Sequence, residues 1–242
     1  MDRRGVSAIL LAAGLSRRMG QVNKLALPVG GEPLLCRIAR TLCAAPLREI
    51  VAVLGHEAEL AEGLLEGLPL RVVHNPGYQA GQMSSVHRGL AALSEPCAGV
   101  MVCLADQPLL TVADIAHIAG AFISECPRPV LVPTWQGRRG NPIVLGWEQR
   151  DAILSGERNL GCKRLIEKNP ELVWPLPMPN DHCVLDLDSP EDYQRLRYRL
   201  LPAAAEPADT PDRPAKTQAG ADPGVLSRPD TDPNHPRHSN GH

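Results

Sequence analysis

The feature that most constrains the fold of this chain is a series of short, continuous apolar runs that alternate with longer stretches in which apolar residues recur at helical spacing. A continuous apolar run is typical of a strand that is buried on both faces, and such strands belong to parallel sheets whose crossover helices cover both faces. We therefore predict an α/β fold of three layers, with a mostly parallel sheet between two layers of helices.

The predicted elements follow from this alternation. The predicted strands are the runs at residues 6–14, 49–55, 70–75, 99–106, 129–135, 141–146 and 183–188. The predicted helices are residues 33–45, 56–68, 83–93, 111–124, 161–169 and 189–200. Two of these helices have a recognisable start. Thr111 is followed three residues later by Asp114, and Ser189 precedes a proline at the first helical position.

The composition of the chain changes after Leu201. Residues 202–242 hold one valine, one leucine and no aromatic residue, and proline recurs throughout them. A segment with so little apolar surface cannot offset the entropy that is lost on ordering. We predict one folded domain over residues 1–201 and a disordered tail, rich in proline, alanine and aspartate, over residues 202–242.

Composition argues against two classes of partner and one kind of site. Lys and Arg number 25 against 27 Asp and Glu, and aromatic residues make up 3%, so the chain lacks the basic excess and the stacking residues of a nucleic-acid binder. No apolar run has the length of a membrane span, and the first one has strand character, so we expect a cytoplasmic protein without a membrane partner. The seven cysteines include no Cys-x-x-Cys pair, which favours reduced thiols over a zinc or iron–sulfur site.

Ligands of such sheets bind beyond the carboxyl ends of the strands, so the residues after each strand are the candidates for function. After the first strand comes LAAGLSRRMG, followed by Lys24. Small residues let backbone N–H groups approach an anion, and Arg18 and Lys24 would neutralise it. The stretch matches neither the phosphate loop, because no Lys-Ser or Lys-Thr follows Gly20, nor the dinucleotide fingerprint, because residue 16 is serine. A glycine turn with solvated arginines explains these residues equally well at this point.

The loop after the third strand reads NPGYQAGQMSSVHRGL. Asn75 and Gly81 lie in this loop, and Ser84 and Ser85 open the next predicted helix. Hydroxyl groups at a helix N-terminus can hold a phosphate or the edge of a base. They can also serve as a simple helix cap, and the residues alone favour that alternative.

Acidic residues follow the fourth and the last predicted strands. In the stretch LADQPLL, Asp106 stands at the end of an apolar strand, where a carboxylate is placed to hold a divalent metal, and Thr111 already serves as the cap of the next helix. Asp186 and Asp188 are two residues apart, so on a strand both point to the same face. Two acids on one face of a buried strand are costly unless they are paired or metal-bound. The start of the next helix offers a structural role for Asp188 but none for Asp186.

Together these stretches resemble the molybdenum cofactor cytidylyltransferases. The matching stretches are LAAGLSRRMG with Lys24, LPVGGEPLL, NPGYQAGQMSSVHRGL, LADQPLL, RRGNP and DLDSPEDY, in family order over most of residues 6 to 200. The wider family includes the guanylyltransferase of the same cofactor and sugar-nucleotide pyrophosphorylases. LAAG and Asp-Gln-Pro are similar to the cytidylyl branch, since the guanylyl branch tends to have a second glycine at position 13 and methionine at 107.

The resemblance implies a fold and an activity. The fold is a Rossmann-like domain of the nucleotide-diphospho-sugar transferase type. The activity is magnesium-dependent transfer of CMP from CTP to the phosphate of molybdenum cofactor, with release of pyrophosphate. The client that receives the product would be a molybdoenzyme or its chaperone.

The resemblance also implies roles for individual residues. Those that act on the transferred phosphates would be Arg18, Lys24 and Asp106. Those that bind the nucleotide would be Leu11, Ala12, Ala13, Gly14, Ser16, Arg18, Gly20, Lys24, Asn75, Gly81, Ser84, Ser85 and Asp106. Those that bind the acceptor would be Gln107, Arg139, Gly140 and Asn141. Those that hold magnesium would be Asp106 with a second acid, Asp186 or Asp188.

Two departures from the family pattern lie toward the acceptor. Asn141 stands where the family often has histidine, and GERNLGCKRL replaces a compact Gly-Asp-x-Gly-Ala-Arg. Three alternatives therefore stay open: another nucleoside triphosphate, another phosphorylated acceptor such as a sugar or alcohol phosphate, or a non-catalytic protein that binds or delivers the cofactor to a molybdoenzyme. A pure binding protein has no need of Asp106 and Asp186 on converging strand ends, and the glycine spacing disfavours a dehydrogenase.

Overall fold

The structure is a computed structural model, and it describes residues 5–19, 22–155 and 169–200. The predicted helix at 161–169 therefore lies outside the described residues except for its last position. The predicted tail at 202–242 lies wholly outside them, and so does Cys162. The other six cysteines, which the structure describes, are all free thiols: Cys36, Cys43, Cys97, Cys103, Cys126 and Cys183.

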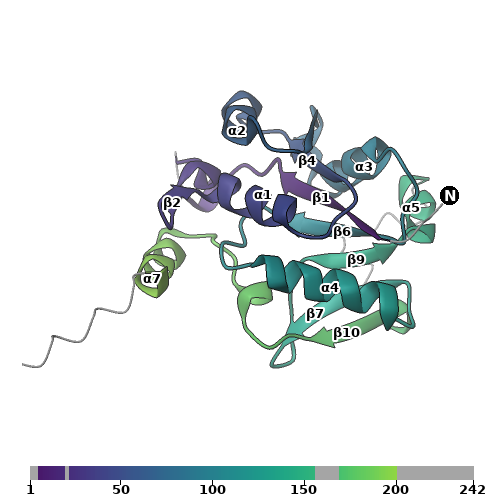
Figure 1. Cartoon of the computed structure of the whole chain (residues 1–242). Helices are drawn as coiled ribbons and strands as arrows, with labels where there is room; N and C mark the ends of the chain where they lie inside the picture. The colour runs from purple at the N-terminus through teal and green to yellow at the C-terminus, as the bar shows by residue number, and fades with distance from the viewer. Residues whose placement is uncertain (1–4, 20–21, 156–168, 201–242) are drawn as a thin grey trace, which may run out of the picture. The chain divides into compact units, whose positions relative to one another are not determined.

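A mixed, mostly parallel sheet forms the centre of the fold, with the strand order β10-β7-β9-β6-β1-β4-β5 and with β8 paired to β7 (Figure 1). The strands are β1 Val6–Ala12, β4 Ile50–Leu54, β5 Arg71–His74, β6 Gly99–Leu104, β7 Val130–Trp135, β8 Arg138–Arg139, β9 Ile143–Gly146 and β10 Val173–Pro177. β1 runs parallel to both β4 and β6, whereas β9 is antiparallel to β6 and β7. A separate short hairpin joins β2 Pro28–Val29 to β3 Glu32–Pro33.

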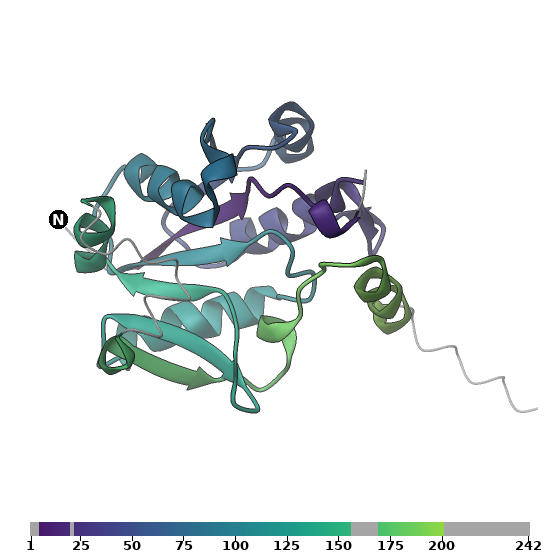
Figure 2. The same ribbon diagram turned by 180° about the vertical axis from the view of Figure 1, so that it is seen from behind.

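Helices cover both faces of the sheet. The helices are α1 Leu34–Ala44, α2 Ala58–Leu65, α3 Gln82–Ala92, α4 Val112–Ser124, α5 Glu148–Leu154 and α7 Pro190–Leu200. Figure 1 shows α1 and α4 in front of the sheet, and Figure 2, seen from behind, shows α3 and α5 on the other face. The three-layer α/β fold expected from the sequence is confirmed.

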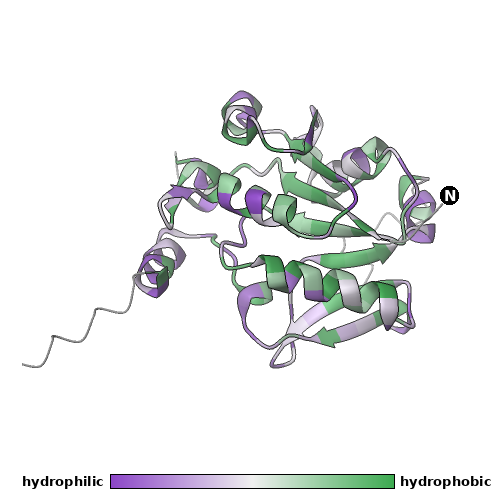
Figure 3. Ribbon diagram, in the orientation of Figure 1, coloured by the Kyte–Doolittle hydropathy of each residue, from purple (hydrophilic) through white to green (hydrophobic). Residues whose placement is uncertain are grey.

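The alternation of side chains along β1 explains the two layers of core. Ala8 and Leu10 pack with residues of α1 in one buried cluster, whereas Ile9 packs with Val86 and Leu90 of α3 in the other. Because successive residues of a strand point to opposite faces, a continuous apolar run supplies both clusters at once. Figure 3 shows the same arrangement, with apolar strands at the centre and polar residues on the outer sides of the helices.

The helix starts predicted at Thr111 and Ser189 are confirmed. The Thr111 hydroxyl accepts a hydrogen bond from the Asp114 amide at 3.2 Å, and the Asp114 carboxylate accepts one from the Thr111 amide at 2.9 Å. Ser189 and Asp192 form the same reciprocal pair at the start of α7, at 3.2 and 3.0 Å. Each pair satisfies backbone donors that the first turn of a helix leaves without partners.

The strand predicted at residues 183–188 is wrong. The segment begins with a short 3₁₀ turn, η5 His182–Val184, and then runs extended without pairing to the sheet. Its backbone bonds to loops instead, because the Cys183 carbonyl accepts from the Asn141 amide and the Leu187 amide donates to the Asp106 carbonyl, each at 2.8 Å. The apolar spacing reflects burial of Cys183 and Leu187, which a loop achieves here without a strand.

The sequence did not reveal the edge strand β10. This strand reads VWPLP, and proline cannot donate a hydrogen bond to a neighbouring strand. β10 tolerates its two prolines because, among the described strands, it lies at the edge of the sheet and pairs only with β7.

The short helix α5 was also not predicted. Among the described helices, none combines the length and the apolar character that a membrane span requires.

Candidate functional site

A cavity of about 490 Å³ opens at the carboxyl ends of β1 and β6. Its lining comes from four segments that are far apart in the sequence. They are the end of β1 with the loop after it (Leu11, Ala12, Ala13, Gly14, Leu15, Ser16, Arg18, Lys24 and Leu25), the loop into α3 with the first turn of that helix (Tyr78, Gln79, Gly81, Gln82 and Ser85), the end of β6 with the two residues after it (Leu104, Ala105 and Asp106), and Asp188. The sequence predicted this end of the sheet as the site.

The loop after β1 is held by bonds among its own residues. Ser16 has a positive φ of 50°, which is uncommon for a residue other than glycine, and its hydroxyl accepts a hydrogen bond from the Lys24 amide at 3.3 Å. The Asn23 side chain accepts from the Leu25 amide at 3.0 Å and so caps the short turn that begins at Lys24. No described atom lies within 4 Å of the position a Cβ would take at Gly14. The protein itself therefore does not require glycine there, whereas close approach of a ligand would.

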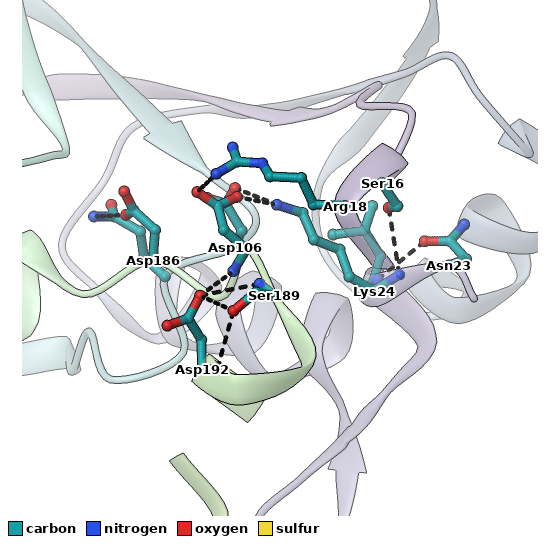
Figure 4. Close-up of polar contacts among 11 residues, drawn as sticks. Ser16, Arg18, Asn23, Lys24, Asp106, Asp186, Ser189 and Asp192 are labelled. Carbon is teal, nitrogen blue, oxygen red and sulfur yellow. Dashed lines mark hydrogen bonds and ion pairs between the residues drawn. The ribbon is translucent and has the colours of Figure 1, made fainter. Parts of the chain in front are cut away.

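Four charged side chains meet beside the cavity (Figure 4). The Lys24 ammonium lies 2.6 Å from Asp106 Oδ2 and 3.1 Å from Asp188 Oδ1. Arg18 Nη1 lies 3.0 Å from Asp188 Oδ2. Lys24 is only 13% exposed at its side chain, whereas Arg18 is 72% exposed. The loop after β1 thus supplies two cations, and the ends of two other segments supply the acids that face them.

Asp186 lies next to this group. Its Oδ1 accepts a hydrogen bond from Gln107 Nε2 at 3.1 Å. Desolvation by the surrounding protein and the neighbouring carboxylate of Asp106 raise the pKa of Asp186 to about 6, with a further contribution from Asp188. A third negative charge is thus costly beside these two acids, and a bound cation would remove that cost.

The acids fit a divalent cation that is shared with a substrate. Asp106 Oδ1 is buried without a hydrogen-bond partner among the described residues, although its other oxygen pairs with Lys24. As they stand, no three acidic, histidine or cysteine side chains within the described part of the chain are grouped as a metal cage. Magnesium usually takes one or two carboxylates together with phosphate oxygens and water. Asp106 with Asp186 or Asp188 suits that kind of site and does not suit an all-protein one.

The loop into α3 is shaped by Asn75. This side chain is 6% exposed and does not line the cavity; it donates to the hydroxyls of Ser84 and Ser85 at 2.8 and 3.0 Å. Its oxygen accepts from the Gly77 amide at 3.0 Å. Ser84 likewise does not line the cavity, whereas Gly81 and Ser85 do. Asn75 and Ser84 therefore hold the loop, whereas Gly81 and Ser85 face the cavity where a ligand would lie.

Sequence reasoning missed several lining residues in the same segments. They are Leu15, Leu25, Tyr78, Gln79, Gln82, Leu104 and Ala105. The two glutamines were within reach of prediction, because they flank Gly81 and carry amides that can read polar groups of a ligand. Gly20, which was predicted to bind the nucleotide, lies outside the described residues.

None of the four residues predicted to bind the acceptor lines the cavity. Gln107 is fully buried, and its amide donates to the Cys183 carbonyl at 3.0 Å as well as to Asp186. A side chain at Gly140 would collide with the Cys183 carbonyl, and the Asn141 amide donates to that same oxygen. Arg139 is exposed on β8. In this structure three of the four therefore support the segment that carries Asp186 and Asp188.

Comparison with known proteins defines the class of protein to which this site belongs. The model of the MobA-like NTP transferase domain matches residues 8–172. The chain is 30% identical over 206 residues to the purine catabolism protein PucB of Bacillus subtilis, covering 79% of this chain and 96% of that protein. It is 29% identical over 201 residues to the nicotine blue oxidoreductase of Paenarthrobacter nicotinovorans, with the same coverage. It is 32% identical over 174 residues to the molybdenum cofactor guanylyltransferase of Mesorhizobium japonicum, covering 69% and 81%.

Solved structures agree on the fold. A nucleotidyl transferase from Methanothermobacter thermautotroptrophicus superposes with a TM-score of 0.68 at 23% identity, covering 81% of this chain and 98% of that one. Rv0371C of Mycobacterium tuberculosis, solved in complex with manganese, superposes with a TM-score of 0.61 at 22% identity, covering 80% and 97%. With the family match over residues 8–172 and the cavity at the ends of β1 and β6, the chain belongs to the MobA-like NTP transferase family of nucleotidyltransferases.

Proposed function

We propose that this protein is a magnesium-dependent nucleotidyltransferase that moves CMP from CTP to the phosphate of molybdenum cofactor and releases pyrophosphate. The observation that carries the proposal is the meeting of Arg18 and Lys24 with Asp106 and Asp188 beside one cavity at the strand ends. The relative named as a molybdenum cofactor guanylyltransferase supports the acceptor. The residues Ala13 and Gln107, which are typical of the cytidylyl branch, support cytosine as the base.

The chemistry needs charge neutralisation and positioning more than it needs a base. A phosphate oxygen of the acceptor attacks the α-phosphorus of CTP, and the bond from that phosphorus to the bridging oxygen of the β-phosphate breaks. The acceptor phosphate is already ionised at neutral pH, so no residue has to take a proton from it. Catalysis then rests on holding the two phosphates in line and on cations around them.

The four charged residues divide this work. Lys24 exchanges its carboxylate partners for phosphate oxygens of the nucleotide, and Arg18 neutralises charge on the departing pyrophosphate. Asp106, with Asp186 or Asp188, holds the magnesium ion. Magnesium, when bound, supplies positive charge to the phosphate oxygens. The open side of Gly14 leaves room for backbone N–H groups to approach the same anion.

The alternatives keep the same site and change what enters it. Another nucleoside triphosphate or another phosphorylated acceptor needs only a different pocket around the base or the acceptor. A non-catalytic binding or delivery protein would not require three acids beside Lys24. A relative named as an oxidoreductase raises the question of hydride transfer, but the loop after β1 lacks the glycine spacing of a dinucleotide fingerprint. The expected location is the cytoplasm, and the expected client is a molybdoenzyme or its chaperone.

A product assay tests the proposal. The full-length protein is incubated with magnesium and each of the four nucleoside triphosphates in turn, together with molybdenum cofactor or, in parallel, with a sugar or alcohol phosphate. The products are identified by mass while pyrophosphate is measured. A CMP adduct with stoichiometric pyrophosphate supports the proposal. An adduct of another nucleotide would show that this nucleotide, and not CTP, is the donor. An adduct formed only with a sugar or alcohol phosphate would show that molybdenum cofactor is not the acceptor. Absence of pyrophosphate with every nucleotide would leave only a binding role, and a parallel assay with NADPH tests for oxidoreductase activity.

A further inference from the structure

The segment at residues 180–188 carries two of the three acids of the site, yet it is not part of the sheet. Its position therefore comes from backbone bonds to neighbouring loops and from side chains that hold it at each end. One end is the cap of α7, where the Asp192 carboxylate accepts hydrogen bonds from the amides of Asp188 and Ser189 at 3.3 and 3.0 Å. The other end is attached to α4, and this attachment has no role in the function described so far.

The attachment to α4 is a buried carboxylate with four hydrogen bonds. Asp114 is 4% exposed. Two of its bonds come from the amide and the hydroxyl of Thr111, at 2.9 and 2.7 Å, and belong to the helix cap. The other two come from across the sequence: Asn180 Nδ2 donates to Oδ1 at 2.8 Å, and His182 Nδ1 lies 2.8 Å from Oδ2. Because a carboxylate only accepts, His182 donates to it.

A helix cap does not need the second pair of bonds. Thr111 and Asp114 complete the capping box by themselves, and that box exists on many helices without a distant partner. Asn180 engages an oxygen of Asp114 for which Thr111 supplies no hydrogen bond, and the Asn180 carbonyl oxygen also accepts from the His182 amide at 3.1 Å. The Asp114 carboxylate thus caps α4 and also holds residues 180–182 through Asn180 and His182. We call these two bonds the anchor.

The anchor is continuous with the acids. Directly after His182, the Cys183 carbonyl accepts from Gln107 Nε2 and from the Asn141 amide, and Gln107 also donates to Asp186. The Leu187 amide then donates to the carbonyl of Asp106, the acid that ends β6. Fixing the segment at 180–182 therefore fixes the register in which Asp186 and Asp188 approach Asp106 and Lys24.

We propose that Asn180 and His182, through their bonds to Asp114, are positioning residues for the cation that Asp106, Asp186 and Asp188 hold. Neither residue lines the cavity, so they act through the segment and not on the substrate. This inference rests on the proposed function, because it assumes a cation at those acids. Groups that hydrogen-bond metal ligands directly typically affect metal affinity by 10- to 100-fold, and Asn180 and His182, which act through the segment, should have an effect at the lower end of that range.

The test compares three variants of the full-length protein. His182→Leu removes the donor to Asp114 at similar bulk, and His182→Asn keeps an amide donor near the position of Nδ1. Thr111→Ala is the matched control, because it removes the hydroxyl donor to the same carboxylate without touching residues 180–188. For each variant, Mn²⁺ binding in the presence of CTP is measured by electron paramagnetic resonance, and the melting temperature is recorded. Asn180→Ala serves as a second route if His182→Leu does not fold.

The expected results distinguish an effect on the position of the acids, measured as Mn²⁺ affinity, from an effect on the stability of the fold, measured as melting temperature. His182→Leu weakens Mn²⁺ binding about tenfold, His182→Asn stays near the wild type, and Thr111→Ala lowers the melting temperature without changing Mn²⁺ affinity. If the wild type binds Mn²⁺ with CTP and His182→Leu binds it equally well, the positioning role is overturned and the proposed function stands. An equal loss of affinity in His182→Leu and Thr111→Ala also overturns it, because the effect is then only structural. If the wild type binds no Mn²⁺ with CTP, the proposed cation site itself fails.

Discussion

The two sides of the charged site are built in different ways. The loop after β1, which carries Arg18 and Lys24, is shaped by bonds between residues that lie close together in the sequence, from Ser16 to Lys24 and from Asn23 to Leu25. The segment at 180–188, which carries Asp186 and Asp188, is shaped by partners far away in the sequence, among them Asp114 and Gln107 at separations of 66 to 79 residues. A local loop keeps its form as long as its own residues are kept. A segment fixed by distant partners depends on the packing of the whole domain.

The two sides also differ in exposure and in what a substrate would meet first. Arg18 stands 72% exposed at the rim, whereas the Lys24 side chain is mostly buried between two acids. Asp106 contacts both sides, since its side chain pairs with Lys24 and its backbone carbonyl accepts a hydrogen bond from the Leu187 amide. Changes at Asp106 should therefore have the largest effects, and changes on either side alone should have smaller ones.

Asp106→Asn should abolish turnover while the protein stays folded. The change removes a negative charge from an acid that contacts both sides, and its buried Oδ1 has no hydrogen bond to lose among the described residues. Turnover at limiting magnesium and the melting temperature are the measurements. Asp151→Asn, the same change at an exposed position of α5, is the control and should behave as wild type. Near-normal turnover of Asp106→Asn at limiting magnesium would show that this acid holds no cation.

Arg18→Ala should weaken CTP binding or slow turnover by about 10- to 100-fold, the range that corresponds to roughly 1.5–3 kcal/mol for a charge-assisted contact. The reason is that a triphosphate carries more negative charge than backbone N–H groups can neutralise, so the cations of the loop must contribute. Turnover is measured against CTP concentration, beside Arg17→Ala as the neighbouring control, for which we expect a smaller effect. If neither substitution changes turnover, the loop is a solvated turn. If Arg17→Ala has the larger effect, Arg17 and not Arg18 contacts the phosphates.

The same difference between local and distant contacts decides what the sequence could reveal. The loop after β1 was predictable, because its small residues, its serine and its cations stand together in the chain after an apolar strand. The cap at Thr111 and Asp114 was predictable for the same reason. The carboxyl-end position of the cavity followed from the strand and helix pattern, since parallel strands end at one edge of the sheet.

The segment at 183–188 could not be predicted in the same way. Buried Cys183 and Leu187 give it the apolar pattern of a strand, and only the distant bonds to Gln107, Asn141 and Asp106 show that it is a loop. The family resemblance implies that Gln107 meets the acceptor. In the structure Gln107 is fully buried and donates to the Cys183 carbonyl, a contact with this segment that no local pattern indicated.

Gly140→Ala should destabilise the domain by about 1–3 kcal/mol, because the added methyl group collides with the Cys183 carbonyl and has no room to relax. Urea denaturation measures the effect. Gly120→Ala on α4 is the matched control, because no described atom lies within 4 Å of its Cβ position and alanine favours the helix by about 0.5–1 kcal/mol. Equal stability of the two variants would mean that the 180–188 segment can move at Cys183 without cost. The packing of the domain would then not fix this segment, contrary to the difference drawn above.

The smallest effect concerns the pH dependence of the anchor at Asp114. Burial alone would raise the pKa of this carboxyl, but hydrogen bonds from Asn180, His182 and Thr111 outweigh burial, and the pKa lies below its usual value. An acid whose pKa is lower in the folded state stabilises the fold above its unfolded pKa of about 3.9, and this stabilisation is lost as the pH falls through the folded pKa.

Asp114→Asn removes that contribution. The wild type should therefore exceed Asp114→Asn in unfolding free energy at pH 6, and the part of the gap that comes from titration should shrink as the pH falls from 4 to 2.5. The same pair of measurements on Ser16→Ala, which removes a bond of the local loop and no charge, should give a gap that does not change with pH. A gap for Asp114→Asn that is constant down to pH 2.5 would show that the carboxylate is not favoured by its partners. The charge of Asp114 would then contribute nothing to holding the 180–188 segment, just as the bonds that hold the loop after β1 involve no charged group.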